Sequence, residues 1–367
     1  MKDKLLVLLI VGAFSSIASA QSSVTLYGVL DVGIRMDTHQ TANGGKLFTM
    51  GNGGMLSSNR WGILGSEDLG GGMKAFFRLE SGFTPNTGAL QQATPAGAPR
   101  IFGRSAYVGL SNNYGSVTLG RQYTLIHETV ASNDVFQLAN YSQTYAFQAA
   151  GETGGARLDN SIRYTSPQFA GFTIRGQYTL GGVAGDFHHA SSPEISFTYA
   201  SGPLTVNGAY VVINDIGGLT PATSTYGSTY YGITIPDSKQ KAAAIGATYA
   251  FSKFTLYANY IYSHVSPADY KNNSFSVAGD YFVTPSFDIR LPVYFDFLHH
   301  AGTSGARITT GPVFDYFLSK LTDVYAGFDY NHFTGAWTTL ASNSSFTMPI
   351  HGYNSVLETY VGLRHKF

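Results

Sequence analysis

The feature that most constrains this chain is an alternation of apolar and polar side chains with a period of two residues. In residues 287–297 every odd position is apolar, while the even positions include Asp288, Arg290 and Asp296. Three further segments alternate in a similar way: 171–180, 254–262 and 357–367. Successive side chains of a strand point to opposite faces, whereas a helix repeats every 3.6 residues or so. The pattern therefore predicts β-strands.

The breaks between the alternating segments are short and long in turn. Seven short breaks fall near 69–72, 112–115, 166–171, 200–203, 251–253, 284–286 and 319–322. Eight long breaks fall near 38–56, 84–100, 124–156, 181–192, 214–238, 264–273, 299–306 and 335–351. These connections join sixteen strands, and the even number leaves both ends of the chain on one side. Transmembrane barrels have this layout, with short periplasmic turns and longer outer loops.

The composition fits strands that show one face to lipid and the other to water. Charged residues are 12% of the chain, about half the usual share, while aromatic residues reach 14% and crowd the strand ends, as interface girdles require. After residue 20 no apolar run approaches the length of a membrane helix. The chain is therefore predicted to be all-β, a transmembrane 16-stranded antiparallel β-barrel. A barrel of that size leaves an aqueous channel. A soluble sandwich or β-helix, the alternative, packs its apolar face against protein.

The first twenty residues have the layout of a secretory signal peptide. Lys2 and Lys4 precede an apolar stretch at 5–14, and small residues follow at 18–20. We expect a signal peptide at 1–20 and a single barrel domain at 21–367, exported through the periplasm to the outer membrane. The chain has no cysteine, so neither disulfides nor thiolate metal sites are expected. Its near-zero net charge argues against a nucleic-acid partner.

Several blocks of sequence resemble one known family. They are the opening 23–28 (Ser-Val-Thr-Leu-Tyr-Gly) and the blocks 65–75, 102–110, 318–325 and 361–367. In this order they resemble the Gram-negative trimeric general porins of the betaproteobacterial type. The middle of the chain, roughly 130–310, matches in pattern alone. The resemblance implies passive diffusion of small hydrophilic solutes and ions through a homotrimer in outer-membrane lipid, with no cofactor.

The resemblance also implies that the third outer loop folds into the barrel and narrows the pore. The longest break, 124–156, is that loop here, and its acids are Glu128, Asp134 and Glu152. The terminal Phe367 resembles the family's signal for insertion into the membrane. A simpler interpretation is that Phe367 is the lipid-facing end of the last strand, and the two interpretations are compatible.

Wall arginines that face the inward loop are the candidates for setting selectivity. By position in the family's motifs, Arg60 and Arg157 match two such residues. By parity, further arginines are expected on the interior face: Arg35, Arg78, Arg163, Arg175, Arg290 and Arg307. Interior acids by the same rule are Asp31, Glu80, Asp159, Asp288 and Asp296. Gly103 stands where some members carry a third arginine, which predicts a wider or less anion-favouring constriction.

Two arginines do not fit the interior face. Arg104 and Arg121 share parity with apolar neighbours. An arginine that faces lipid at mid-membrane costs about 2–4 kcal/mol. These two residues are therefore expected near a rim, at a bulge or in a subunit interface.

Other functions find less support in the sequence. There is no G-x-S-x-G, no H-E-x-x-H and no Gly-rich phosphate loop, so no enzyme is expected. His188-His189 and His299-His300 are adjacent pairs, whose side chains point to opposite faces of a strand, so no metal site is expected. A substrate-specific channel and a surface-binding or adhesion barrel remain open. Aromatic residues near 123–147 could line a sugar path, although packing of the loop against the wall explains them more simply.

Overall fold

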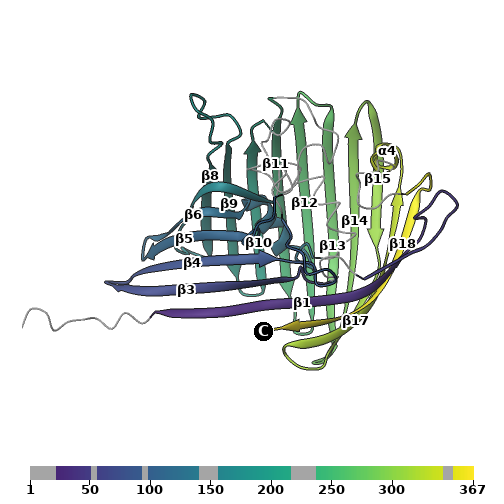
Figure 1. Ribbon diagram of the computed structural model, residues 1–367, viewed down its shortest axis with the longest axis horizontal. Coiled ribbons are helices and arrows are strands. Elements are labelled where there is room, and N and C mark those ends of the chain that lie inside the picture. The colour runs from purple at the N-terminus through teal and green to yellow at the C-terminus, as the bar shows by residue number, and fades with distance from the viewer. Residues whose placement is uncertain (1–21, 51–55, 93–97, 140–155, 216–236, 342–349) are drawn as a thin grey trace, which may run out of the picture.

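The computed structural model describes residues 22–50, 56–92, 98–139, 156–215, 237–341 and 350–367. Within them, eighteen β-segments form one antiparallel sheet, whose first and last members pair with each other (Figure 1). These members are β1 (Ser23–Asp37) and β18 (Ser355–Lys366). The sheet is therefore a closed barrel. The expected signal peptide at 1–20 lies outside the described residues.

Two of the barrel strands are each made of two segments. β2 (Leu47–Met50) and β3 (Arg60–Gly70) both pair with β1. β15 (Thr303–Thr310) and β16 (Val313–Phe317) both pair with β14 and β17, and Pro312 between them has no N–H to donate. The eighteen segments thus make sixteen antiparallel strands, which confirms the fold class expected from the sequence.

The other strands follow in chain order around the barrel. They are β4 (Met73–Gly82), β5 (Ser105–Asn112), β6 (Gly115–Tyr123), β7 (Arg157–Thr165), β8 (Phe172–Thr179), β9 (Ser192–Ser201), β10 (Leu204–Ile213), β11 (Lys239–Ala250), β12 (Phe254–Ser266), β13 (Tyr270–Thr284), β14 (Phe287–His300) and β17 (Thr322–Phe333). Two helices are described, α2 (Leu125–Ser132) and α4 (Ala336–Ala341). No helix among the described residues has both the length and the hydropathy to cross a bilayer.

The strands are polar on their buried face and apolar on their exposed face. In β13, Asn272 and Ser274 are fully buried, while Phe275 and Val277, whose positions have the opposite parity, are 44% and 54% exposed. A water-soluble protein would show the reverse arrangement. The exposed apolar face is suited to lipid, and the polar face lines the interior. The period-two pattern of the sequence thus marks the two faces of the barrel.

The connections agree with the sequence on one side of the barrel and differ in places on the other. All seven expected short turns join consecutive strands. The expected long loops at 264–273 and 299–306 are wrong, because β12 ends at Ser266 and β13 begins at Tyr270, and only two residues separate β14 from β15. The outer ends of these strands are polar, so an apolar alternation could not reveal them.

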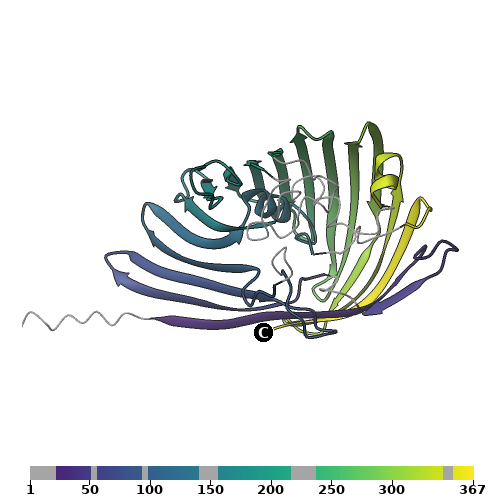
Figure 2. The same cartoon turned by 45° about the horizontal axis from the view of Figure 1, so that its top comes forward.

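The barrel wall surrounds a helix. Figure 2 shows the bluish strands β3–β6 on one side, the green to yellow strands β14–β18 on the other, and α2 between them. The helix directly follows β6 in the chain, in the third of the long connections. What holds α2 against the wall is therefore the starting point for the functional site.

Candidate functional site

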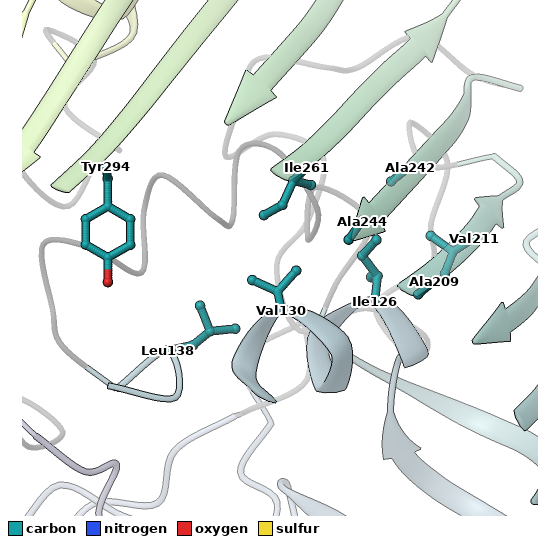
Figure 3. Close-up of a cluster of buried hydrophobic side chains, with 9 residues drawn as sticks. All are labelled: Ile126, Val130, Leu138, Ala209, Val211, Ala242, Ala244, Ile261 and Tyr294. Atoms are coloured by element: carbon teal, nitrogen blue, oxygen red, sulfur yellow. The ribbon is translucent and has the colours of Figure 1, made fainter. Parts of the chain in front are cut away.

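Helix α2 lies against the buried faces of several strands through an apolar cluster. Three side chains of this segment contact apolar side chains of the wall: Ile126 and Val130 of the helix and Leu138 beyond it (Figure 3). The wall contributes Ala209, Val211, Ala242, Ala244, Ile261 and Tyr294. Alanines at the contact allow the helix to approach the wall closely. The segment after β6 is therefore packed against the polar, buried side of the sheet rather than extended away from it.

Polar side chains of the wall fix the same segment at both ends of the helix. The carboxylate of Glu194 in β9 accepts the backbone N–H of Leu125 at 2.6 Å. Asn207 in β10 donates to the Asn133 side chain at 2.9 Å, and Asn259 in β12 donates to the Val130 carbonyl at 3.1 Å. These bonds satisfy groups at the helix ends that would otherwise be buried without partners.

Asp134 is one of these anchors and does not lie on the cavity surface. Its carboxylate accepts the hydroxyl of Tyr294 and the backbone N–H groups of Phe136 and Leu138, at 3.2 and 2.9 Å. The residue is 3% exposed. Burial raises the pKa of Asp134 above its ordinary value, and the hydrogen bond from Tyr294 offsets part of that rise. The expectation of a pore-facing acid at this position differs from the structure, because the loop turns the side chain toward the wall.

A cavity of about 650 Å³ separates α2 from strands β1, β3 and β4. Four arginines line it, and the acids among its lining residues are Glu80 and Glu128. The arginines are Arg60, Arg78, Arg104 and Arg175. The helix side contributes His127, Thr129 and Ser132, and Tyr123 lies between wall and helix. The lining is thus polar and carries more positive than negative side chains.

Glu80 is the centre of the charge contacts on the wall side. Its carboxylate lies 2.7 Å from Arg104 Nε and 3.9 Å from Arg60 Nε. It also accepts the hydroxyl of Tyr27 at 2.7 Å, while the guanidinium of Arg78 lies over the Tyr27 ring at 5.6 Å. One carboxylate thus orients several cationic groups without balancing their total charge.

Tyr123, the last residue of β6, is the centre on the helix side. Its hydroxyl oxygen accepts hydrogen bonds from Arg104 at 2.6 Å and from Arg157 at 2.7 Å. The guanidinium of Arg157 also lies over the Tyr123 ring at 4.2 Å, and His127 stacks on the ring at 4.4 Å. Arg163 pairs with Glu128 at 2.8 Å. Arg157 and Arg163 are therefore next to the cavity, although neither lines it.

The remaining predicted site residues lie elsewhere. Arg35, expected at the constriction, is buried against Asp37 and Glu358, at 2.9 and 3.9 Å, and is not part of the cavity lining. Its parity predicted an interior position. Parity does not predict where along the pore axis an interior residue lies, so it could not place Arg35 at the constriction. Glu152 lies outside the described residues. Phe367 closes the last strand pair through backbone bonds with Gly28.

The parity rule misplaced Arg104 but not Arg121. Arg121 lies at a bulge, where the register of β6 against β7 shifts, as one of the expectations allowed. Arg104 instead lines the cavity, because it precedes the first residue of β5 and parity has no meaning outside a strand. Its place directly before a strand was the signal that could have excluded it from the rule. His127 has no such signal, since it depends on the loop conformation.

Gly103 leaves no room for an arginine side chain. A Cβ atom at this position would lie 2.9 Å from the Gln92 side chain and 3.0 Å from two backbone oxygens. The connection between β4 and β5 would have to move before a larger side chain could fit. The absence of an arginine is therefore built into the local backbone.

The wall across from the arginines carries acids in closed ion-pair networks. Arg290 binds Asp288 at 2.6 Å and Asp315 at 3.2 Å. Arg364 binds Asp315 and Asp323, both at 3.1 Å. All of these acids are buried. The interior is therefore asymmetric, with arginines around the cavity and paired carboxylates on the β14–β18 side.

One group of potential metal ligands occurs among the described residues, at the ends of two connections. His189, Asp215 and Asp237 place one ligand atom each within 4.8 Å of the others. His189 Nε2 lies 2.7 Å from Asp215 Oδ2, and Asp237 donates its backbone N–H to Asp215. His188 is not part of the group, and neither histidine lies in a strand, so the expected divergence of strand side chains does not apply here. These direct contacts hold the two connections together.

Comparison with known proteins associates these features with one family. A family model described as Gram-negative porin matches residues 6–336. An outer membrane porin protein of Bordetella pertussis is 32% identical over 238 residues, 58% of this chain and 60% of the relative. Outer membrane porin protein 32 of Delftia acidovorans is 35% identical over 185 residues, 49% of this chain and 50% of the relative. The chain thus spans 50% to 60% of the length of these curated relatives.

Solved structures show the same barrel at lower sequence identity. An anion-selective porin from Comamonas acidovorans matches with a TM-score of 0.73 and 23% identity, over 95% of this chain and 100% of that chain. OmpF of Salmonella typhi, in a complex with daunomycin, matches with a TM-score of 0.62 and 16% identity, over 94% and 97% of the two chains. At these identities the matches establish the fold.

Proposed function

Because the chain belongs to the Gram-negative porin family, we propose that it forms a water-filled channel through which small hydrophilic solutes and ions diffuse passively. As a member of this family it is an outer-membrane protein. The observation that carries the proposal is the charged cavity inside a closed barrel whose outer face is apolar. A barrel of sixteen strands is wide enough for an aqueous channel. The proposal includes no catalytic step and no cofactor.

We further propose that residues 124–156 form the constriction and that the channel works as a homotrimer. The contacts of α2 with β9–β12 support an inward course for the described part of this loop. One of the solved structures with the same fold, an outer membrane protein of Vibrio cholerae, is described as a trimer form. Its TM-score of 0.64 shows a shared barrel architecture. The lipid around the trimer would contact the exposed apolar faces of the strands.

The charges around the cavity favour anions. Arg60, Arg78, Arg104 and Arg175 face Glu80 and Glu128, so the lining has an excess of positive charge. Selectivity in a pore depends on the charges at its narrowest point. In the proposed constriction Arg60 and Arg78 act directly on passing solutes. Arg157 and Arg163 act through Tyr123 and Glu128, which they contact.

A planar lipid bilayer tests the channel itself. The refolded protein is expected to give conductance steps in groups of three, with a conductance linear in salt concentration. A saturating conductance in the presence of one solute would favour a substrate-specific channel instead. If a verified, folded barrel gave no channels, the proposal would fail and a surface-binding role would replace it.

Removal of two cavity charges tests the anion preference. In a potassium chloride gradient, the Arg60→Gln, Arg78→Gln variant is expected to shift the zero-current potential toward cation selectivity, because two of the four lining arginines become neutral. Lys74→Gln is the matched control, since Lys74 is an exposed cation near the short β3–β4 turn. An unchanged potential in the double variant would contradict the roles of both arginines.

A further inference from the structure

The hydroxyl group of Tyr123 occupies an unusual position among the charges of the cavity. Two guanidinium groups donate to its oxygen, that of Arg104 at 2.6 Å and that of Arg157 at 2.7 Å. No described residue accepts the hydrogen of this phenol. Because Tyr123 lines the cavity, a solute in the cavity can supply this acceptor.

Arg157 is separated from the cavity by this tyrosine. It is 5% exposed and does not line the cavity. Its guanidinium lies over the Tyr123 ring at 4.2 Å, and its Nε atom is buried with no hydrogen-bond partner among the described residues. Its charge can therefore reach a passing solute most directly through the phenol that it contacts.

We propose that the Tyr123 hydroxyl is a hydrogen-bond donor for oxyanions in the channel and that it transmits the charge of Arg157 to them. This inference rests on the proposed channel function and names a solute class, small carboxylates and phosphate. A hydroxyl oxygen that accepts from two cationic donors is polarised, so its own hydrogen becomes a stronger donor. Carboxylate and phosphate oxygens are the acceptors that suit such a donor.

Contacts of its ring and backbone fix Tyr123 beside the cavity. His127 stacks on Tyr123 at an interplanar angle of 13°, while the guanidinium of Arg157 also lies over the ring. Arg163 donates to the Tyr123 carbonyl at 2.5 Å and fixes the backbone. A phenol held in this way loses little conformational entropy when an anion binds, so more of the hydrogen-bond energy contributes to the preference for oxyanions.

The variant Tyr123→Phe tests the donor without changing any charge. The ring and its stacking partners remain, and only the hydroxyl is lost. In a potassium acetate gradient, the acetate-to-potassium permeability ratio should fall by about three- to tenfold, as for a charge-assisted hydrogen bond that water partly replaces. Tyr260→Phe is the control, because Tyr260 does not line the cavity and its hydroxyl donates to Asn273 at 2.9 Å.

A double-mutant cycle with Arg157→Met separates transmission from general damage. If Tyr123 transmits the charge of Arg157, Tyr123→Phe should change the permeability ratio less in the Arg157→Met background than in the wild type, with the remaining effect due to the hydroxyl that Arg104 still contacts. Independent, additive effects of the two substitutions would overturn the proposal. The heat-dependent electrophoretic mobility of each variant verifies that it has folded into a barrel before its channels are compared.

The outcomes distinguish this inference from the proposed function. A wild-type protein that forms no channels, or that prefers potassium over acetate, contradicts the proposed anion channel. A wild-type channel that prefers acetate and is changed less than twofold by Tyr123→Phe leaves the channel intact and overturns the role of Tyr123. Equal losses in Tyr123→Phe and Tyr260→Phe would also overturn it, since they would reflect a general effect of removing a hydroxyl.

Discussion

Charged side chains of the barrel interior have two different surroundings. Arg60 and Arg78 line the cavity. Asp134 and Asp288, by contrast, are buried and bound to protein groups on the wall or in the loop. Charge alone therefore does not identify a residue that acts on solutes. Whether a charged side chain can act on solutes depends on the groups that it contacts.

Asp134 is expected to stabilise the loop rather than to select ions. In Asp134→Ala the Tyr294 hydroxyl and two backbone N–H groups lose their acceptor, which should lower the free energy of unfolding by about 1–3 kcal/mol. The loosened loop should also increase the frequency of current fluctuations in single channels. Urea unfolding of the refolded barrel and bilayer recordings measure the two effects.

The control for this prediction is Ser132→Ala. Ser132 is exposed on α2, and its hydroxyl donates only to the Glu128 carbonyl within the helix. Its loss should leave both the stability and the current noise near the wild-type values. If the two variants behaved alike, the bonds of Asp134 would not be what holds the loop.

The alternation of the sequence could predict which strand residues face the interior but not how deep they lie. Arg60, Arg78 and Arg175 were placed on the interior face and do line the cavity. Arg35 was placed there by the same rule, yet it lies in an ion-pair cluster elsewhere. Parity predicted the wrong position for Arg104, because this residue precedes the first residue of β5. Depth depends on strand tilt and on the course of the loop, which a period of two residues does not encode.

Between strands, aromatic rings cover glycines of the neighbouring strand. The ring of Phe77 in β4 lies over Gly65 in β3, and that of Phe197 in β9 lies over Gly208 in β10. The ring of Phe367 covers Gly28 in β1 in the same way. Each ring fills the space that the missing side chain leaves, so the pair holds the register of two strands.

The contact between Gly28 and Phe367 is expected to stabilise the last strand pair. A Cβ atom at position 28 would lie 2.2 Å from the Phe367 ring, so Gly28→Val forces the ring away. The overpacking should lower the free energy of unfolding by about 1–3 kcal/mol, measured by urea titration in lipid vesicles. Gly176→Val is the matched control, because no atom lies within 4 Å of a Cβ at Gly176 in β8. Equal losses in both variants would show that the ring contact contributes nothing specific.

The tight hairpins at the outer ends of β12–β15 are joined by Asp269. Its carboxylate accepts the Gly302 N–H at 2.6 Å and lies 3.1 Å from His299 Nε2. The hydrogen bond from Gly302, followed by the histidine, lowers the pKa of Asp269 below its ordinary value. The ionised carboxylate therefore stabilises this contact above the ordinary pKa, and the contribution is lost as the pH falls through the lowered one.

Nuclear magnetic resonance in micelles can follow this titration. The amide proton of Gly302 is expected to shift as Asp269 takes up its proton, with a midpoint below the ordinary pKa of an aspartate. Asp269→Asn should abolish the shift. A midpoint at or above the ordinary value would contradict the hydrogen bond from Gly302.

The strands themselves were largely predictable, since the alternation and the short turns gave their number and order. The sequence failed at the outer ends of β12–β15, where Lys271 and Asn272 continue a strand with polar residues on both faces. Main-chain pairing with β14 carries the strand there, and it leaves no apolar pattern. Loop length is therefore the least predictable property of such a barrel.

Across the whole molecule, the arginines and the paired acids lie on different sectors of the wall. The cavity borders β1, β3, β4 and β8–β10, whereas the networks of Arg290 and Arg364 lie on β14–β18. In these networks the carboxylates of Asp288, Asp315 and Asp323 outnumber the two guanidinium groups, so this sector does not attract anions. The sector around the cavity is then the part of the interior that most influences the path of an anion.

The exposed apolar face is expected to contact lipid. Val277 lies near the middle of β13 and is 54% exposed. Val277→Arg should lower the free energy of unfolding in vesicles by about 2–4 kcal/mol, the cost of a cation on the lipid face at the midplane. Val277→Leu, the control, should fold like the wild type. Normal folding of the arginine variant would mean that protein or water, and not lipid, covers this face.

The pairing of β1 with β18 has a consequence for how the molecule is made. It joins Val29 to Lys366, so the two edges that meet are separated by nearly the whole chain. Every hairpin in between can pair with the preceding strand as soon as it enters the membrane. The pairing of β1 with β18 can form only after the last strand has arrived. Until then two open edges offer unpaired N–H and C=O groups to any other strand nearby. The risk of misassembly is therefore highest before this last pairing forms. Chaperones that bind the chain before insertion would have to protect these two edges above all.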